Sequence, residues 1–287
     1  MRLKPQTQGR PRPATPEGRP MSGQDFKDFV VVVTGASTGL GRAVAVETAA
    51  RGARAVIINF ARSRDEAEES ARLVAAHGAQ AVLVQGDVGE DEECRAIAAA
   101  AAPFGHIDAL FNNAGVTKFA PNHADLDAVD AQDFMDLYRV NVVGAYQTLR
   151  ACRSLLEQAP QPGAVVNTSS IAGVMGIGSS VPYAASKGAL TTMTLSLARA
   201  LAPKIRVNAV CPGFIDTPWF EKGLPAGRAE KMRQGAAAST PLKAASTAED
   251  VAGATVFLAS PAARHITGET LLVDAGTHLG AAPLSMR

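Results

Sequence analysis

Short apolar runs alternate with longer segments of helical periodicity along most of the chain. The run Phe29–Val33 is β-branched and ends at a glycine turn, which is typical of a strand buried on both faces. We predict further strands over 54–60, 81–85, 107–111, 164–168, 206–210 and 270–273. We predict helices over 42–51, 64–77, 90–102, 131–158, 182–201 and 248–259.

Strands and helices that alternate in this way form a parallel, doubly wound sheet covered by helices on both faces. The chain shows no internal repeat and no Pro-rich linker after its first residues. We therefore predict an α/β fold of Rossmann type, with three α/β/α layers, as a single domain over 26–287. Ligands bind such sheets at the carboxyl ends of the strands, and the polar motifs described below all lie there or on neighbouring helices.

Residues 1–25 break the pattern, because they are rich in Pro and Arg and almost lack apolar periodicity. This composition predicts a disordered tail. The tail has no apolar core of a secretory signal. Met21 is a candidate for the true start, and N-terminal sequencing of natively expressed protein would test it.

The composition excludes several classes of function. A net charge of +1 gives no bulk electrostatic case for binding nucleic acid or an anionic membrane, and no apolar run approaches the roughly 20 residues of a membrane span. The three cysteines, Cys94, Cys152 and Cys211, are widely spaced and odd in number. They are typical of reduced packing residues in a cytoplasmic protein, and we predict neither a disulfide framework nor a metal site.

A glycine-rich turn, Thr34–Gly41 (TGASTGLG), joins the first strand to the first helix. Such a turn presents backbone N–H groups and the positive end of the helix dipole to an anion, and its glycines let a dinucleotide pyrophosphate approach closely. The spacing is GxxxGxG rather than the usual GxGxxG. An ordinary tight turn is the alternative.

The second strand ends without the acidic residue that would hold the ribose 2′-hydroxyl of NAD. Asn59, Arg62 and Arg64 stand there instead, and arginine suits a 2′-phosphate. A solvated helix start is the alternative, although the helix dipole disfavours cations at that end. We therefore expect NADP(H) as the preferred cofactor, with NAD(H) as the other candidate.

Three later strands also end in polar residues. Asp87, before Val88, either accepts a hydrogen bond from an adenine amino group or caps the next segment. The run 112–115 (NNAG) either lets a ribose lie against the backbone or makes a plain turn. Ser170 either donates to a substrate oxygen or caps a turn.

Tyr183 and Lys187 lie at positions i and i+4 of a predicted helix, so their side chains share one face. A cation beside a phenol stabilises the phenolate, and we expect the pKa of Tyr183 to lie below its ordinary value of about 10. Such a pair suits acid–base catalysis near neutral pH. Two unrelated surface residues are the alternative. Ser170 precedes Tyr183 by 13 residues, and Asn141 lies in an apolar helical stretch where its amide needs partners.

Five motifs together resemble the short-chain dehydrogenase/reductase family over about residues 27–277. These motifs are TGASTGLG (34–41), NNAG (112–115), NVVG (141–144), a serine 13 residues before YAASK (183–187), and CPGFIDT (211–217). Within the family, 3-oxoacyl-[acyl-carrier-protein] reductases are the most similar subgroup. The resemblance implies the same fold, a homotetramer, and an NAD(P)(H)-dependent oxidoreductase that interconverts a carbonyl and a secondary alcohol.

The resemblance also implies a catalytic tetrad of Asn141, Ser170, Tyr183 and Lys187. Tyr183 exchanges the proton, Lys187 lowers its pKa and holds the nicotinamide ribose, Ser170 holds the substrate oxygen, and Asn141 keeps a water in a proton relay. With the residues above, the predicted cofactor site comprises Gly35, Ser37, Thr38, Gly39, Leu40, Gly41, Asn59, Arg62, Asp87, Val88, Asn113, Ala114, Gly115, Tyr183, Lys187, Pro212, Gly213 and Thr217.

The region 214–247 departs from the α/β rhythm and contains several apolar residues, including Trp219. We predict a substrate lid there, with a surface helix as the alternative. An apolar loop, 174–181, lies between Ser170 and Tyr183, so we expect an apolar, small-molecule substrate.

Two other functions are weighed against the oxidoreductase. A catalytically silent nucleotide-binding regulator would share the fold, but the intact Asn–Ser–Tyr–Lys set argues against it. A serine hydrolase is excluded, because Ser169 and Ser170 lack a nearby histidine and the nucleophile-elbow context.

Overall fold

The computed structural model describes residues 23–217, 219 and 227–280. Its centre is a seven-stranded sheet in which every pair of neighbouring strands is parallel, in the order β3-β2-β1-β4-β5-β6-β7. The strands are β1 Val30–Val33, β2 Ala55–Phe60, β3 Gln80–Gln85, β4 Ala109–Asn112, β5 Gly163–Thr168, β6 Ile205–Pro212 and β7 Thr270–Val273. This order confirms the predicted doubly wound α/β fold.

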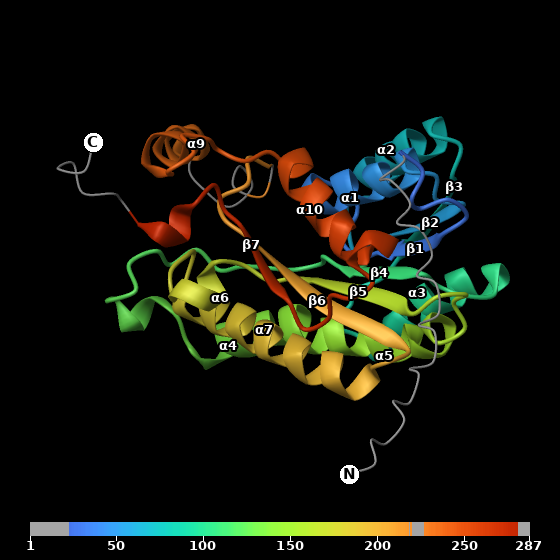
Figure 1. Cartoon of the computed structure of the whole chain (residues 1–287). Helices are drawn as coiled ribbons and strands as arrows, with labels where there is room; N and C mark the ends of the chain where they lie inside the picture. Colours follow the sequence, from blue (N-terminus) through green and yellow to red (C-terminus); the bar gives the residue numbers. More distant parts are fainter. Residues whose placement is uncertain (1–22, 218, 220–226, 281–287) are drawn as a thin grey trace, which may run out of the picture.

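The helices form two layers, one on each face of the sheet (Figure 1). One layer holds α1 (Gly39–Ala50), α2 (Arg64–Ala76) and α10 (Ala248–Ala259). The other holds α3 (Asp91–Ala101), α4 (Ala131–Tyr138), α5 (Ala145–Leu156) and α7 (Val181–Leu201), while α6 (Ala172–Met175) packs on α7 and α9 (Arg228–Ser239) lies beyond the sheet. Short 3₁₀ turns span Ala102–Phe104, Leu126–Ala128, Pro261–Ala263 and Thr277–Leu279.

Two hydrophobic cores hold the layers together, one on each face of the sheet. Every residue of β1 is fully buried. Val31 and Val33 pack toward α1 and α10, whereas Val30 and Val32 pack toward α3 and α5. Burial on both faces explains why the strands are continuous apolar runs rather than alternating ones. This core fixes the strand ends that carry the polar motifs.

The long helix predicted over 131–158 is wrong in detail. The residues Arg139–Gly144 form a π-helical segment between α4 and α5. A π turn adds a residue to the helix without breaking it, and such turns occur frequently at functional sites. Here the segment contains Asn141, whose amide bonds to a neighbouring loop instead of pointing into an apolar layer. A period of 3.6 in the sequence cannot reveal this local change.

The predicted boundary at residue 26 stays a prediction, although one residue before it pairs with the domain, and residues 281–287 lie outside the described residues. Asp25, assigned to the tail, forms an ion pair with Arg51 at 2.8 Å, and Phe26 is fully buried. Residues 1–22 of the predicted tail, and 218 and 220–226 of the predicted lid, lie outside the described residues.

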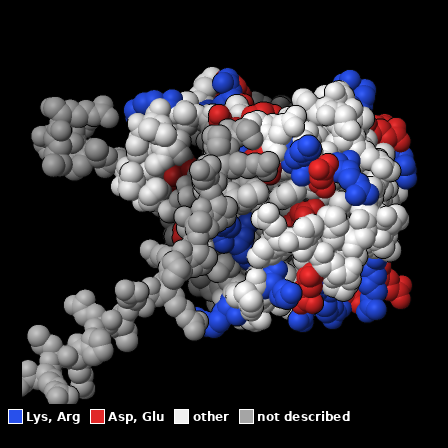
Figure 2. Space-filling view, turned by 45° about the vertical axis from the view of Figure 1, so that its right-hand side comes forward, with Lys and Arg blue, Asp and Glu red and all other residues white. Residues whose placement is uncertain are grey.

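The distribution of charged side chains and the state of the cysteines are relevant to nucleic acids, membranes and metals as possible partners. Lys and Arg lie interspersed with Asp and Glu among the described residues on the face in Figure 2. The three cysteines are buried and free. No helix among the described residues is both long and apolar enough to cross a membrane, and the described residues contain no cluster of three or more His, Cys, Asp or Glu side chains suited to a metal ion.

Candidate active site

A cavity of about 540 Å³ opens at the carboxyl ends of the strands, a size in the range of small-molecule sites. It brings together residues from the ends of β1 to β6. All the predicted site residues line this cavity except Gly41 and Asn141, which lie behind its wall. Trp219 and Arg139 line it as well. The placement follows from the parallel sheet, in which all strand ends meet at one edge.

The glycine-rich turn packs so tightly that side chains are excluded at two positions. Gly35 has a φ of +62°, and a Cβ there would lie 2.8 Å from Cα of Ala114. A Cβ on Gly41 would lie 2.3 Å from the carbonyl oxygen of Gly35. Helix α1 begins just after Thr38, whose side chain makes no capping hydrogen bond in the described structure. The N–H groups at this helix start therefore suit an anionic group.

Asn59 and Arg62 occupy different environments at the end of β2. Asn59 is buried; its Oδ1 accepts from the Gly35 N–H at 3.3 Å, and its Nδ2 donates to the Gly86 carbonyl at 2.9 Å. The Asn59 amide therefore braces the glycine turn. Arg62 is exposed and lines the cavity. Arg64 lies over the Phe60 ring instead, 5.4 Å from its centroid, so of these two arginines only Arg62 lines the cavity.

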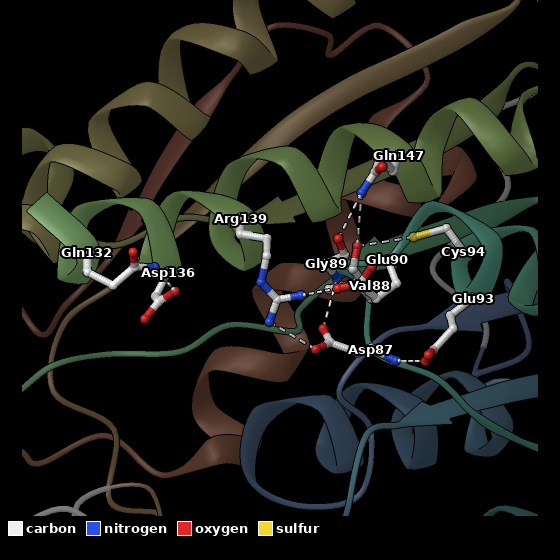
Figure 3. Close-up of polar contacts among 10 residues, drawn as sticks. All are labelled: Asp87, Val88, Gly89, Glu90, Glu93, Cys94, Gln132, Asp136, Arg139 and Gln147. Carbon is white, nitrogen blue, oxygen red and sulfur yellow. Dashed lines mark hydrogen bonds and ion pairs between the residues drawn. The ribbon is translucent and has the colours of Figure 1, made fainter.

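Asp87 lies on the cavity wall, in a turn held by Arg139 (Figure 3). Its Oδ1 accepts from the Gly89 N–H at 2.8 Å, and its Oδ2 accepts from Nη2 of Arg139 at 3.0 Å. Burial acts to raise the pKa of the Asp87 carboxyl, but these hydrogen bonds outweigh it and hold that pKa below its ordinary value. Asp87 closes the turn before α3 rather than capping the helix, whose N-cap residue is Glu90, and the carboxylate keeps lone pairs for a ligand.

Ser170, Tyr183 and Lys187 meet at the other end of the cavity. Nζ of Lys187 lies 5.8 Å from the centroid of the Tyr183 ring and donates to the Thr168 carbonyl at 2.7 Å. Ser170 hydrogen-bonds with Tyr183, which acts to lower the phenol pKa. The three side chains come from the end of β5 and the first turns of α7, so sheet and helix together fix their separation.

The expected direction of the Tyr183 pKa is wrong for the chain itself. Burial raises the pKa of Tyr183 to about 12, which outweighs the bond from Ser170. Burial also lowers the pKa of Lys187 to about 8. Both shifts have the same physical cause, because a site with little water penalises the phenolate and the ammonium alike. A shared helix face gives the pair its proximity, but the sequence does not show its burial.

Asn141 is buried behind the loop that follows β4. Its Oδ1 accepts from the Val116 N–H at 2.8 Å, and its Nδ2 donates to the Val116 carbonyl and to Oγ of Ser186, both at 3.0 Å. The amide therefore fixes the loop beside Lys187, because a Cβ on Gly115 would lie 3.2 Å from Oδ1 of Asn141 and 3.6 Å from Nζ of Lys187. The water relay through Asn141 stays a prediction.

Sequence reasoning missed Arg139, Thr34 and Ser186. Arg139 precedes Asn141 by two residues but bonds to Asp87, 52 residues away. Oγ1 of Thr34 accepts from the N–H groups of Asn113 and Ala114, both at 3.0 Å. The threonine lies inside the recognised glycine motif, and its position directly after β1 was the available signal. The Arg139 contact had no such signal.

Comparisons with known proteins agree with this geometry. The family model described as enoyl-(acyl carrier protein) reductase matches residues 35–278. "Granaticin polyketide synthase putative ketoacyl reductase 2" of Streptomyces violaceoruber is 41% identical over 252 residues, which are 87% of this chain and 96% of that protein. An L-rhamnose 1-dehydrogenase (NAD(P)(+)) of Azotobacter vinelandii is 38% identical and covers the same shares.

A solved structure has the same fold. The crystal structure of a short-chain dehydrogenase from Burkholderia cenocepacia J2315 in complex with NADP has a TM-score of 0.78 at 30% sequence identity, covering 88% of this chain and 99% of that one. The sequence resemblance, the matched family model and this likeness over nearly the whole domain agree. The chain belongs to the short-chain dehydrogenase/reductase family.

Proposed function

We propose that this protein is an NADP(H)-preferring oxidoreductase that interconverts a carbonyl and a secondary alcohol. The observation that carries the proposal is the convergence of Ser170, Tyr183 and Lys187 in the cavity that the glycine-rich turn also lines. The named relatives act in the same general chemistry, as a ketoacyl reductase and a rhamnose dehydrogenase.

The cavity fits an extended dinucleotide. Gly35 and Gly41 would leave room for a pyrophosphate at the start of α1. Asp87, Val88 and Arg62 line the cavity; in this proposal the first two contact the adenine, and Arg62 binds a 2′-phosphate. The 113–115 loop and the Pro212–Gly213 turn with Thr217 would hold the ribose and nicotinamide end. When bound, the dinucleotide supplies or accepts the hydride.

Within this scheme the chain supplies the proton and the orientation. Tyr183 gives its proton to the carbonyl oxygen in reduction and takes it back in oxidation, while Ser170 donates a hydrogen bond to the same oxygen. A phenol with a pKa of about 12 is protonated at neutral pH, which is the form required to give a proton. Lys187 holds its ammonium beside the phenol and the ribose site.

Apolar side chains lie near Tyr183, both in the cavity lining and on the loop before that residue. Val174, Met175 and Ile177 are exposed on the loop and short helix before Tyr183, and Trp219 lines the cavity. Lys118, a polar candidate nearby, forms an ion pair with Asp133 at 3.0 Å. We therefore infer an apolar carbonyl substrate, covered by a lid within 214–247.

We also infer a cytoplasmic homotetramer. The three free cysteines suit a reducing compartment. Helices α4, α5 and α7 expose Met135, Tyr146 and Leu195 on their layer, and apolar side chains of this kind suit a subunit interface. Size-exclusion chromatography with light scattering would measure the oligomer.

A carbonyl panel with NADPH and with NADH tests the proposed function. We expect carbonyl-dependent loss of reduced-cofactor absorbance, with a lower KM for NADPH than for NADH. A lower KM for NADH would overturn the role of Arg62. Tight cofactor binding with no turnover across the panel would instead support the silent nucleotide-binding regulator.

A further inference from the structure

The guanidinium of Arg139 bridges two carboxylates of one turn. Its Nη2 donates to Oδ2 of Asp87 at 3.0 Å, and its Nη1 donates to Oε1 of Glu90 at 2.9 Å. Figure 3 shows the side chain reaching from the π-helical segment across to the turn after β3. Arg139 also lines the cavity, beside Asp87 and Val88.

The backbone of the turn that contains Asp87 and Gly89 fixes the position of the Arg139 guanidinium. A Cβ on Gly89 would lie 2.0 Å from Nη1 and 2.6 Å from Cζ of Arg139, so the guanidinium lies directly against the Gly89 backbone. The same residue donates its N–H to Oδ1 of Asp87 at 2.8 Å. Arg139 and Gly89 therefore hold the two carboxylate oxygens from different directions.

This geometry matters for the base of a dinucleotide. An ionised carboxylate only accepts hydrogen bonds, and each oxygen keeps a lone-pair direction beyond the one already used. A 6-amino purine offers an N–H donor to such an acceptor. A 6-oxo purine offers another acceptor at the same atom, and two facing acceptors repel.

We propose that Arg139 is a specificity-determining positioning residue, which fixes the Asp87 carboxylate as the acceptor that selects a 6-amino purine over a 6-oxo purine in the dinucleotide. The inference rests on the proposed function, because it requires a dinucleotide in the cavity. It goes beyond that function because it assigns base selection to Arg139, a side chain of the π-helical segment, whereas Asp87 lies in the turn after β3.

If Arg139 served only to stabilise the fold, its loss would lower the melting temperature, but the exposure of the ion pair argues against such a role. The side chains of Arg139 and Asp87 are 41% and 33% exposed, and ion pairs this exposed contribute little to stability. Loss of Arg139 should therefore leave the melting temperature nearly unchanged. Base selection is the property that the pair is placed to control.

The test compares NADPH with its hypoxanthine analogue, which differs only in carrying a 6-oxo purine. Dissociation constants are measured by calorimetry on the full-length protein. We expect the wild type to bind NADPH about tenfold or more tightly than the analogue, since hydrogen bonds to charged groups are among the stronger ones. In Arg139→Gln, the ratio of the dissociation constant of the analogue to that of NADPH should fall toward one.

Gly89→Ala provides a second variant that keeps both Arg139 and Asp87. Its methyl group would occupy the place of Nη1 and displace the guanidinium, so the ratio should fall as it does in Arg139→Gln. Arg150→Gln is the matched control, because Arg150 lies on α5 and pairs with Asp91, away from the cavity lining. It should keep the wild-type ratio.

The outcomes separate this inference from the function beneath it. If the wild type binds neither NADPH nor NADH, both the proposed function and the role of Arg139 are wrong. If the wild type binds and discriminates, but Arg139→Gln and Gly89→Ala keep the same ratio, only the role of Arg139 is wrong. An equal loss of affinity for both bases would assign Arg139 a structural role instead.

Discussion

The two ends of the cavity handle charge in opposite ways. At the reaction end, burial raises the pKa of Tyr183 and lowers the pKa of Lys187, so it favours the neutral form of each side chain. At the adenine end, Asp87 lies in a turn where Gly89 and Arg139 stabilise its charged form. One end disfavours charge by excluding water, and the other stabilises charge by pairing it.

This difference suits two kinds of task. A group that exchanges a proton must change its charge during turnover. Where the free protein disfavours the charged form, a bound ligand can determine which protonation state is favoured. A group that recognises a donor must keep one charge and one direction. The cavity therefore combines, along one edge of the sheet, a site whose charge changes and a site whose charge is fixed.

Removing the Tyr183 hydroxyl most directly tests the site whose charge changes. Tyr183→Phe should lower kcat by about 10² to 10⁴, the usual contribution of acid–base catalysis, while the dissociation constant of NADPH stays close to the wild-type value. Stopped-assay turnover and calorimetry measure the two quantities. Tyr146→Phe is the control, because Tyr146 is an exposed tyrosine on α5. Turnover retained by Tyr183→Phe would reject the proton-transfer role.

The sequence predicted the fold and most of the cavity because these depend on local patterns. Buried strands are apolar runs, and a parallel sheet places their ends together, which brings Gly35 and Ser170 to one edge. The family resemblance added Tyr183 to the same site. The sequence did not predict the Tyr183 pKa, since burial depends on how distant segments pack. It also missed Arg139, because no local pattern indicates which of the 28 Lys and Arg residues lies against Asp87.

Burial of Lys187 gives a pH-dependent stability. Its pKa falls from 10.5 in the ordinary state to about 8 in the folded chain, so between these values the unfolded state holds more protons. The contribution of Lys187 to the free energy of unfolding should therefore rise with pH across that window, by on the order of 2 kcal/mol. Below about pH 8 the full cost of burying the ammonium remains.

Chemical denaturation at several pH values between 8 and 10 measures this effect in wild type and Lys187→Met. The buried thiols of Cys94, Cys152 and Cys211, whose pKa values are raised by burial, act in the opposite sense within this window. Tyr183, with its raised pKa, does the same from pH 10 to about 12. These groups are common to all the variants, so the effect of Lys187 is measured as the difference between each variant and the wild type. The free energy of unfolding of the wild type minus that of Lys187→Met should increase by this amount from pH 8 to 10, whereas Lys204→Met, whose lysine is exposed, should follow the wild type. Parallel curves for wild type and Lys187→Met would show that the ammonium is not desolvated.

Substitution of Arg62 tests whether the end of the cavity that contains Asp87 also binds the 2′-phosphate. Arg62→Ala should raise the KM for NADPH about tenfold, through loss of a charge-assisted hydrogen bond, and should leave the KM for NADH unchanged. Steady-state kinetics with both cofactors measures the ratio. Arg64→Ala is the matched control, because Arg64 lies over Phe60 and bonds to Gln85 at 3.3 Å. Equal effects of Arg62→Ala on both cofactors would contradict phosphate recognition.

The smallest expected effect comes from a helix that touches neither end. Gly253 is exposed in the middle of α10, and a Cβ there would meet nothing within 4 Å. Gly253→Ala should raise the free energy of unfolding by about 0.5–1 kcal/mol, because alanine loses less backbone freedom on forming a helix. Denaturation measures the gain, and the KM for NADPH and kcat should not change. A change in either constant would mean that α10 influences the cavity through the β-sheet, and the two ends could then no longer be treated as independent of the layer behind them.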